Sequence, residues 1–151
     1  QLVVDHKARV RAVDMRPGSA NDKAVFNYSH FGKTLPTTIP AGKHIVGDAG
    51  YAISDRVVIP YPVVEVMMPE VAWYNYLHSR TRITVERAIE MIKNRFRMFK
   101  VPLNQKADPK ESRTETEEMG RIIAACLVLH NILIDLRDPT DIIAEEFPDG
   151  L

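Results

Sequence analysis

The first half of the chain consists of short apolar stretches separated by turn residues. Residues 1–15 have two Val-rich stretches on either side of "DHK", a pattern that predicts an antiparallel hairpin. Residues 16–31 begin with a Pro-Gly turn and offer Ser19 or Asn21 as the cap of a short helix. Residues 42–64 carry two further apolar stretches around a glycine-bearing turn, which predicts a second pair of strands.

The second half has the spacing of helices. The Pro-rich and Met-rich residues 60–75 are expected to loop away from the sheet, and helices are predicted over residues 79–100 and 114–136, with a polar loop between them. Strands followed by helices predict an α/β or α+β domain in which helices cover a mixed sheet. The acidic residues 138–151 are predicted to form a frayed tail.

Composition limits the range of functions. The 151 residues are 45% apolar and 26% charged, which is typical of one globular domain. Twenty basic and twenty acidic residues give a formal net charge of zero, so a nucleic-acid partner would need a local basic face. Cys126 lies in an apolar setting that predicts a packed thiol and a reducing compartment. We found no run that predicts a membrane span or signal peptide, so no membrane partner is expected.

Asp48 is the first candidate for chemistry. It follows the apolar run of "HIVGDAGYAI", and in open α/β sheets ligands bind just beyond the carboxyl ends of the strands. Gly47 and Gly50 would allow a sharp turn and leave room for a ligand beside the carboxylate. The alternative is that Asp48 only caps this turn, as aspartate often does.

Glu86 is the second candidate. On a helix, Ile89, Ile92, Phe96 and Phe99 fall within roughly 40° of Val85, and together they predict a face packed on the sheet. Glu86 lies on the flank of this face, at roughly 100° from Val85, where it could lean over the sheet edge. The alternative is an ordinary surface ion pair with Arg82.

Four ordered blocks cover nearly the whole chain: "PGSANDKAVF", "GDAGYAI", "YNYLHSRTRITVERAIEMIKNRFRMF" and "IIAACLVLHNILI". They resemble the DDE-type endonuclease domain of PIF/Harbinger transposases and of their domesticated nuclease-like relatives. The resemblance implies an RNase H-like α/β fold and an Asp, Asp, Glu triad that binds two divalent ions, Mg²⁺ or Mn²⁺. It assigns Asp48 in "GDAGY" as the second catalytic, metal-binding residue and Glu86 in "TVERAIE" as the third. In such sites, one metal activates the nucleophile and the other stabilises the leaving oxygen.

The resemblance also implies partners. The substrate is expected to be DNA, a separate Myb/SANT-like protein is expected to supply DNA targeting, and the expected location is the nucleus or the cytoplasm. From the helical wheel, we predict that Arg80, Arg82 and Lys93 contact the nucleic-acid backbone near the carboxylates.

One part of the family pattern is missing. No segment matches the setting of the first aspartate; Asp5 is better explained as a hairpin-turn residue and Asp14 as the end of the second strand. Ala8 stands where the hairpin is expected to have glycine, which makes the turn less comfortable. We therefore expect residues 1–137 to be an N-terminally truncated endonuclease domain that lacks the first strand of its fold.

Three hypotheses follow. The first is a metal-dependent DNA endonuclease or transposase-derived domain, and the second is an inactive remnant that serves as a DNA-binding or protein-binding module. The third is an unrelated small α/β binding protein, in which Asp48 and Glu86 do not converge. Two other features are expected to be structural: His130 as a core histidine, and the cluster of Trp73, Tyr74 and Tyr76 as packing that holds a loop on the core. The alternative for the aromatic cluster is that its rings stack on bases.

Overall fold

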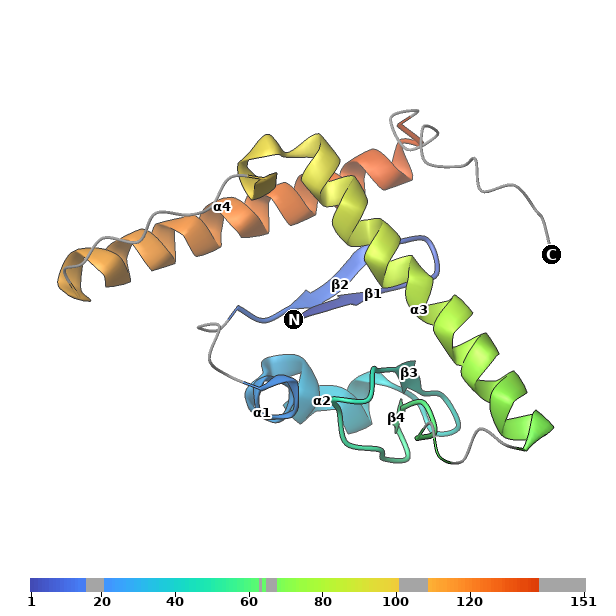
Figure 1. Ribbon diagram of the computed structural model, residues 1–151. Helices are drawn as coiled ribbons and strands as arrows, with labels where there is room; N and C mark the ends of the chain where they lie inside the picture. Colours follow the sequence, from blue (N-terminus) through green and yellow to red (C-terminus); the bar gives the residue numbers. More distant parts are fainter. Residues whose placement is uncertain (16–20, 63, 65–67, 101–108, 139–151) are drawn as a thin grey trace.

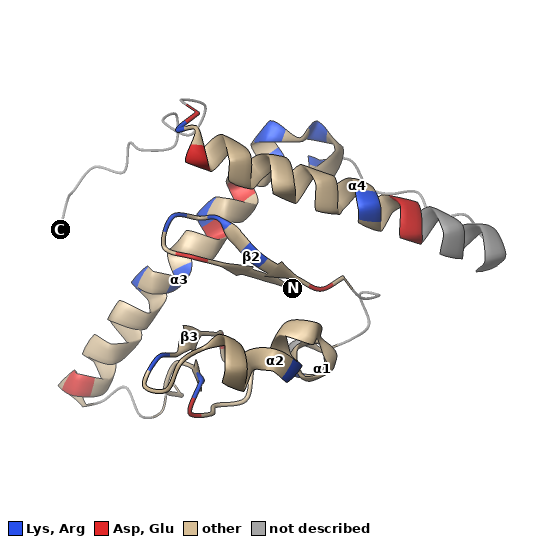
Figure 2. Ribbon diagram, turned by 180° about the vertical axis from the view of Figure 1, so that it is seen from behind, with Lys and Arg blue, Asp and Glu red and all other residues tan. Residues whose placement is uncertain are grey.

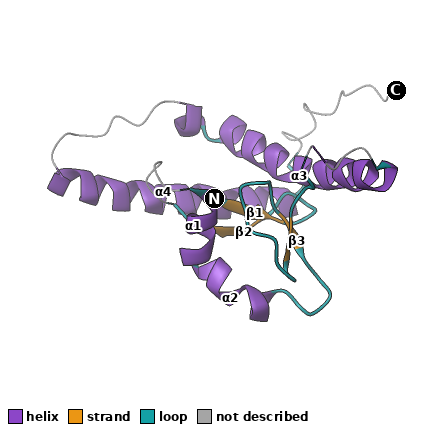
Figure 3. Ribbon diagram, turned by 60° about the horizontal axis from the view of Figure 1, so that its bottom comes forward, coloured by secondary structure: helices purple, strands orange, loops and turns teal. Residues whose placement is uncertain are grey.

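The structure is a computed structural model that describes residues 1–15, 21–62, 64, 68–100 and 109–138. The predicted tail, residues 138–151, lies outside these ranges except for Asp138. Strands and helices are mixed along the chain, as predicted, and helix is the larger part. The strands lie among the helices, with α3 and α4 on one side and α1 and α2 on the other (Figures 1 and 3).

The predicted hairpin at the start of the chain is confirmed. Strands β1 (Leu2–Val4) and β2 (Val10–Val13) pair antiparallel, with an irregularity in register between Val3 and Val4. The turn between them places Ala8 at φ 62°, in the left-handed region that favours glycine. The missing glycine noted in the sequence therefore falls at a position where the backbone has glycine-like geometry.

A short helix follows the hairpin, as predicted. Helix α1 (Asp22–Tyr28) is capped by Asn21, whose side chain accepts a hydrogen bond from Ala24 N at 2.8 Å; Ser19, the other predicted cap, lies outside the described residues. Helix α2 (His30–Thr38) was not predicted. It begins after Ser29, which ends α1 and whose Oγ accepts from Gly32 N at 2.8 Å, so one serine both ends one helix and begins the next.

The second pair of strands is present but does not join the hairpin. Strands β3 (Ile45–Val46) and β4 (Val57–Val58) pair in parallel, so the described residues contain two separate two-stranded sheets and not the single mixed sheet expected from the sequence. The chain between β3 and β4 contains two turns, closed by hydrogen bonds from Tyr51 N to Asp48 O and from Ser54 N to Val57 O, so β4 runs in the same direction as β3. Val57 of β4 is almost fully buried.

Helix α3 (Pro69–Arg95) differs from the prediction at both ends. Much of residues 60–75 was expected to be loop, but the helix begins at Pro69, because proline suits the first helical position and Glu70 lies favourably in the first turn. At the other end, Phe96 is the C-cap, and the chain continues as the short 3₁₀ helix η2 (Arg97–Lys100). The predicted apolar face over residues 85–99 therefore ends with α3.

Helix α4 (Pro109–Asp135) packs on both α3 and β2, while α3 also contacts β1 and β3. Apolar burial in the described residues is modest and comes mainly from Leu35, Val57, Ala88, Ile92, Leu127 and Cys126. The free thiol of Cys126 is buried, as predicted, and lies 3.8 Å from the Met98 sulfur. No described helix has the length and apolar character needed to cross a bilayer.

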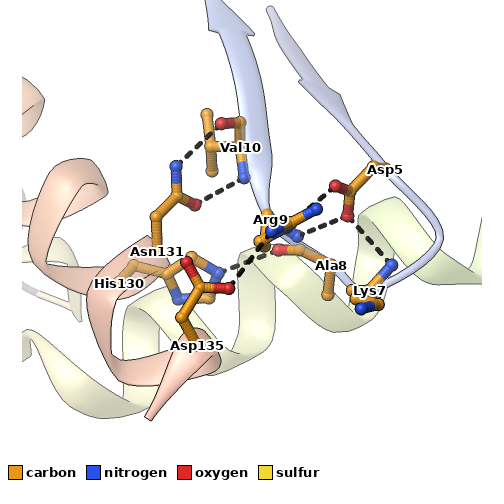
Figure 4. Close-up of polar contacts among 8 residues, drawn as sticks. All are labelled: Asp5, Lys7, Ala8, Arg9, Val10, His130, Asn131 and Asp135. Atoms are coloured by element: carbon orange, nitrogen blue, oxygen red, sulfur yellow. Dashed lines mark hydrogen bonds and ion pairs between the residues drawn. The ribbon is translucent and has the colours of Figure 1, made fainter.

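Polar side chains of α4 bind the hairpin directly (Figure 4). His130 is fully buried; its Nε2 lies 2.9 Å from the Ala8 carbonyl oxygen and its Nδ1 lies 2.8 Å from an Arg95 guanidinium nitrogen. Asn131 accepts from Val10 N at 2.7 Å and donates to Val10 O at 2.9 Å. The prediction that His130 is a core histidine is confirmed, and the pair fastens the hairpin to α4.

Replacing Ala8 with glycine should stabilise the protein. The left-handed conformation costs a non-glycine residue about 1–2 kcal/mol, and glycine would remove this cost. Glycine also gives the unfolded chain more conformational freedom, which lowers the stability of the folded state by about 0.4–1 kcal/mol. We expect Ala8→Gly to raise the free energy of unfolding by about 0.5 kcal/mol in urea denaturation. Ala12→Gly, within strand β2, is the control and should lower it; a lower midpoint for Ala8→Gly would contradict the strain argument.

Candidate functional site

A cleft of about 490 Å³ lies where the hairpin, the β3–β4 unit and α3 meet. This volume is within the range of small-ligand sites. Its carboxylates, Asp5, Asp48 and Glu86, come from three segments far apart in the sequence. The other lining residues that bear on the argument are His6, Phe26, His44, Gly47, Tyr51 and Arg82.

Asp48 lies two residues beyond β3, at the carboxyl end of the strand, as predicted. Its Oδ1 accepts from Gly50 N at 2.9 Å, and its carbonyl accepts from Tyr51 N at 3.2 Å. The turn-capping alternative is therefore real, but it occupies one oxygen: Oδ2 makes no hydrogen bond within the described part of the chain. Asp48 can cap the turn and still present an oxygen to the cleft.

The Tyr51 side chain takes part of the space beside Gly47. A Cβ at Gly47 would lie 3.1 Å from the Tyr51 ring, and that ring packs edge-on against Phe26 of α1 at 5.6 Å. Gly47 was expected to leave space for a ligand, and Tyr51 takes part of that space and folds the Asp48 turn against α1. Gly47, Asp48 and Tyr51 all line the cleft, so the carboxylate still borders open space.

Glu86 lines the cleft from α3. Its Oε1 accepts from an Arg82 guanidinium nitrogen at 2.9 Å, one turn earlier on the helix, so the predicted surface ion pair is present. The Glu86 side chain is 60% exposed, and a pair this open to water contributes little to stability. Glu86 and Asp48 thus share a cleft, whereas the third hypothesis predicted that they would lie apart.

Asp5 also lines the cleft, but other groups engage both of its carboxylate oxygens. Oδ1 accepts from the backbone N–H groups of Lys7 and Arg9 at 2.9 and 3.1 Å, and Oδ2 lies 2.9 Å from Arg9 Nε. Burial alone would raise the pKa of the Asp5 carboxyl, but these hydrogen bonds and the Arg9 charge outweigh it and lower the pKa. Asp5 is the hairpin-turn residue that the sequence predicted, and Asp14 follows β2 as predicted.

The three predicted nucleic-acid contacts are spread around α3. Arg82 lines the cleft, whereas Arg80 lies against Tyr76, with its guanidinium carbon 5.7 Å from the ring centroid. Lys93 is exposed in the last turns of the helix and is not part of the cleft lining. Figure 2 shows basic positions along α3 and at η2. The backbone-binding roles of these three residues remain predictions.

The aromatic cluster at the start of α3 divides into two parts. Tyr74 donates to the Ile59 carbonyl at 3.0 Å and packs edge-on against Tyr61 at 5.2 Å, so it holds the preceding loop on the fold, as predicted. Burial, and to a lesser degree the charge of Tyr61, raises the pKa of the Tyr74 phenol. Trp73 and Tyr76 are exposed instead, which contradicts the prediction for them.

Sequence reasoning missed two residues of the cleft. His6 and His44 both line it. His44 was not expected to be a ligand because its spacing resembles no metal-binding motif, and His6 was not considered. The available signal was position, since His44 immediately precedes β3 and His6 follows β1 in the hairpin turn, close to Asp48 and Asp5 respectively.

The donors of the cleft are suited to a hard cation only in part. Carboxylate oxygens are the preferred ligands of Mg²⁺, and Asp48 and Glu86 each have one oxygen that makes no hydrogen bond within the described residues. Among the residues that the structure describes, however, no three His, Cys, Asp or Glu side chains lie close enough to hold one ion. Within the described residues, the cleft thus offers two carboxylates, Asp48 and Glu86, that each have an oxygen free of hydrogen bonds.

The cleft lies beyond the carboxyl end of a strand, where open α/β sheets bind ligands, and it combines a carboxylate that follows this strand with another from a neighbouring helix. Residues 1–131 match the family model described as a DDE superfamily endonuclease, and the chain belongs to this family. The family resemblance stated from the sequence is confirmed.

The chain is similar to three curated relatives. It is 30% identical over 138 residues to the mouse protein named "Putative nuclease HARBI1", 29% over 154 residues to "Protein ALP1-like" of Arabidopsis thaliana, and 27% over 139 residues to the human HARBI1 protein. These matches cover 89%, 93% and 89% of the chain, but 36% of each relative. The chain therefore corresponds to about a third of their length. No solved structure matches it.

Proposed function

We propose that this chain is the nuclease portion of a divalent-metal-dependent endonuclease that acts on phosphodiester bonds in DNA, built on an RNase H-like fold. One observation carries the proposal. Asp48 and Glu86 come from segments far apart in the sequence, yet they line the same cleft, in a chain that belongs to the DDE superfamily endonucleases. Their two environments also suit the role, since each leaves one carboxylate oxygen outside its local hydrogen bonds.

In this proposal, Asp48 and Glu86 would hold the metal together with a further carboxylate. That third ligand is not one of the carboxylates that the structure describes in the cleft. A bound divalent ion would supply charge to activate the nucleophile and to stabilise the leaving oxygen. The Asp48 turn fixes one ligand by means of Gly50 N, and Arg82 orients the other by means of its bond to Glu86. Arg82 also brings positive charge to the cleft, where it would bind a phosphate of the substrate.

A second candidate is an inactive relative that keeps the fold as a binding module. The observation that favours it concerns Asp5, which lies in the cleft. One of its carboxylate oxygens accepts hydrogen bonds within the hairpin turn, and the other accepts one from the Arg9 side chain. A metal at Asp5 would have to share Oδ2 with Arg9 or displace Arg9 from it, because Oδ1 already accepts from two backbone N–H groups. The two candidates therefore differ in whether the cleft binds a divalent ion.

A calorimetric titration of Mn²⁺ distinguishes them. Asp48→Asn is the suitable variant, because asparagine retains an oxygen that can accept from Gly50 N while losing the charge that binds metal. Glu86→Gln likewise retains an acceptor for Arg82. We expect the parent chain to bind Mn²⁺ saturably, and each variant to bind it at least about tenfold more weakly. Substituting a residue that only supports a metal ligand typically lowers metal affinity about 10- to 100-fold, so loss of a ligand itself should cost no less.

Glu90→Gln is the matched control, since Glu90 is an exposed carboxylate one turn further along α3 and does not line the cleft. It should bind Mn²⁺ as the parent chain does. Equal affinity in the Asp48 and Glu86 variants would refute the assignment of these ligands. Absence of binding in a chain shown to be folded by circular dichroism would favour the inactive module.

We further propose that DNA targeting comes from a separate Myb/SANT-like partner and that the protein acts in the nucleus. The zero formal net charge of the chain supports the first point, because it provides little of the long-range attraction by which DNA-binding proteins find their sites.

A further inference from the structure

Helix α3 carries an exposed aromatic pair on the side away from the cleft. Trp73 is 61% exposed and Tyr76 is 49% exposed, and their rings are stacked with centroids 5.3 Å apart and planes inclined by 27°. Rings of this size are usually buried, and here the adjacent Tyr74 is turned inward. The pair is thus a preformed flat platform open to solvent.

Arg80 extends this platform along the helix. Its guanidinium carbon lies 5.7 Å from the Tyr76 ring centroid, and its NH1 lies 3.4 Å from the Tyr76 hydroxyl. On a helix of about 100° per residue, five of residues 73–87 fall within roughly 80° of one another, opposite Val85. We call them the outer stripe: Trp73, Tyr76, Arg80, Ile83 and Arg87.

The charges of the outer stripe point to one kind of partner. Its two charged residues, Arg80 and Arg87, are both basic and exposed. Stacked aromatic rings next to arginines are the elements with which proteins bind unpaired nucleotides, because bases stack on the rings while the cations meet the phosphates. A base-paired duplex hides the faces of its bases, so the rings favour strands in which bases are free.

We propose that the outer stripe binds a single-stranded segment of nucleic acid, with a base stacked on Trp73 and phosphates held by Arg80 and Arg87. This inference rests on the proposed function. In that function α3 supplies Glu86 to the cleft, and the outer stripe would be a second surface of the same helix that holds unpaired nucleotides. The cleft is on the Val85 side of α3 and the stripe is on the opposite side. One strand would have to pass around the helix to reach both.

The chain contains a built-in reporter, because Trp73 is its single tryptophan. We would titrate the chain with an oligothymidylate of roughly 12 nucleotides in EDTA, so that no metal takes part, and follow the Trp73 fluorescence. A duplex of equal length is the comparison. Stacking should quench the emission saturably with the single strand, and the duplex should quench it much less.

Variants then test the contact by the anisotropy of a labelled oligothymidylate. Trp73→Ala should weaken binding about tenfold, and Trp73→Phe, which keeps a stacking ring, should weaken it much less. Arg87→Ala should reduce the salt dependence of binding. Tyr28→Ala removes an exposed aromatic ring from α1 and should leave the affinity unchanged.

The result can be separated from that of the metal titration. The oligothymidylate titration is made in EDTA, so quenching in a chain that shows no Mn²⁺ binding would support the stripe while the nuclease proposal fails. Unchanged Trp73 emission, or equal affinity of Trp73→Ala and the parent chain, would overturn the stripe proposal. So would a finding that Trp73→Ala only abolishes self-association in sedimentation, which would identify the stripe as a protein interface.

Discussion

Replacing His130 with alanine should lower the free energy of unfolding by about 4 kcal/mol, the largest effect on stability that we expect from one substitution. Arginine can only donate hydrogen bonds, so Nδ1 of His130 accepts from Arg95, and the proton on Nε2 is donated to the Ala8 carbonyl. Alanine would leave both partners without this side chain in a fully buried position, next to a cavity. Urea denaturation followed by circular dichroism measures the loss.

His30→Ala provides the comparison, since His30 is an exposed histidine at the start of α2. It should change the stability by less than about 0.5 kcal/mol. If His130→Ala lowered the free energy of unfolding by less than about 1 kcal/mol, the polar contacts between the hairpin and α4 would stabilise the protein no more than surface contacts do.

Gly32→Ala should destabilise the protein by about 2–3 kcal/mol, the second-largest effect. A Cβ at this position would overlap the Phe26 carbonyl oxygen and lie 2.9 Å from its carbon, and the obstacle is backbone that cannot rotate away. The same carbonyl accepts from Ser29 Oγ at 2.7 Å, so moving it would disturb the junction of α1 and α2. Thermal denaturation of the variant measures the effect.

Gly120→Ala is a matched glycine substitution with the opposite expected sign. A Cβ at Gly120 would meet the Met15 methyl carbon at 3.7 Å, an ordinary contact, within helix α4. Alanine should therefore stabilise the protein by about 0.5–1 kcal/mol through its better helix propensity. Effects of equal sign for the two variants would show that the crowding at Gly32 is relieved by movements that the structure does not indicate.

Elements whose signals are local could be predicted from the sequence. The hairpin, the start of α1 at Asn21, and much of α3 and α4 follow from alternation, capping and helical spacing. The start of α3 was misjudged although its signal was present: Pro69 followed by Glu70 is a helix start, but the other prolines and the tyrosines nearby suggested loop. Helix α2 was missed because Gly32 and Pro36 both disfavour helix, while the Ser29 cap acts in its favour.

Features that depend on partners distant in the sequence could not be predicted. Strands of two residues, such as β3 and β4, contain too little pattern to reveal whether they pair in parallel or with the hairpin. The same limit applies to the site. The positions of Asp48 after a strand and of Glu86 on a helix flank could be predicted, but the packing of Tyr51 on Phe26 and the presence of Asp5 in the same cleft depend on residues far apart in the sequence.

The bond between Asn131 and Val10 has a consequence for how the protein is made. These residues are 121 positions apart, so at roughly 5–20 residues per second the hairpin waits about 6–24 s on the ribosome before its partner on α4 is synthesised. Throughout that interval, the edge of β2 that Asn131 later binds is open to strands of other nascent chains. Arg11, exposed in the middle of β2, places a charge on this edge that discourages such pairing until α4 arrives.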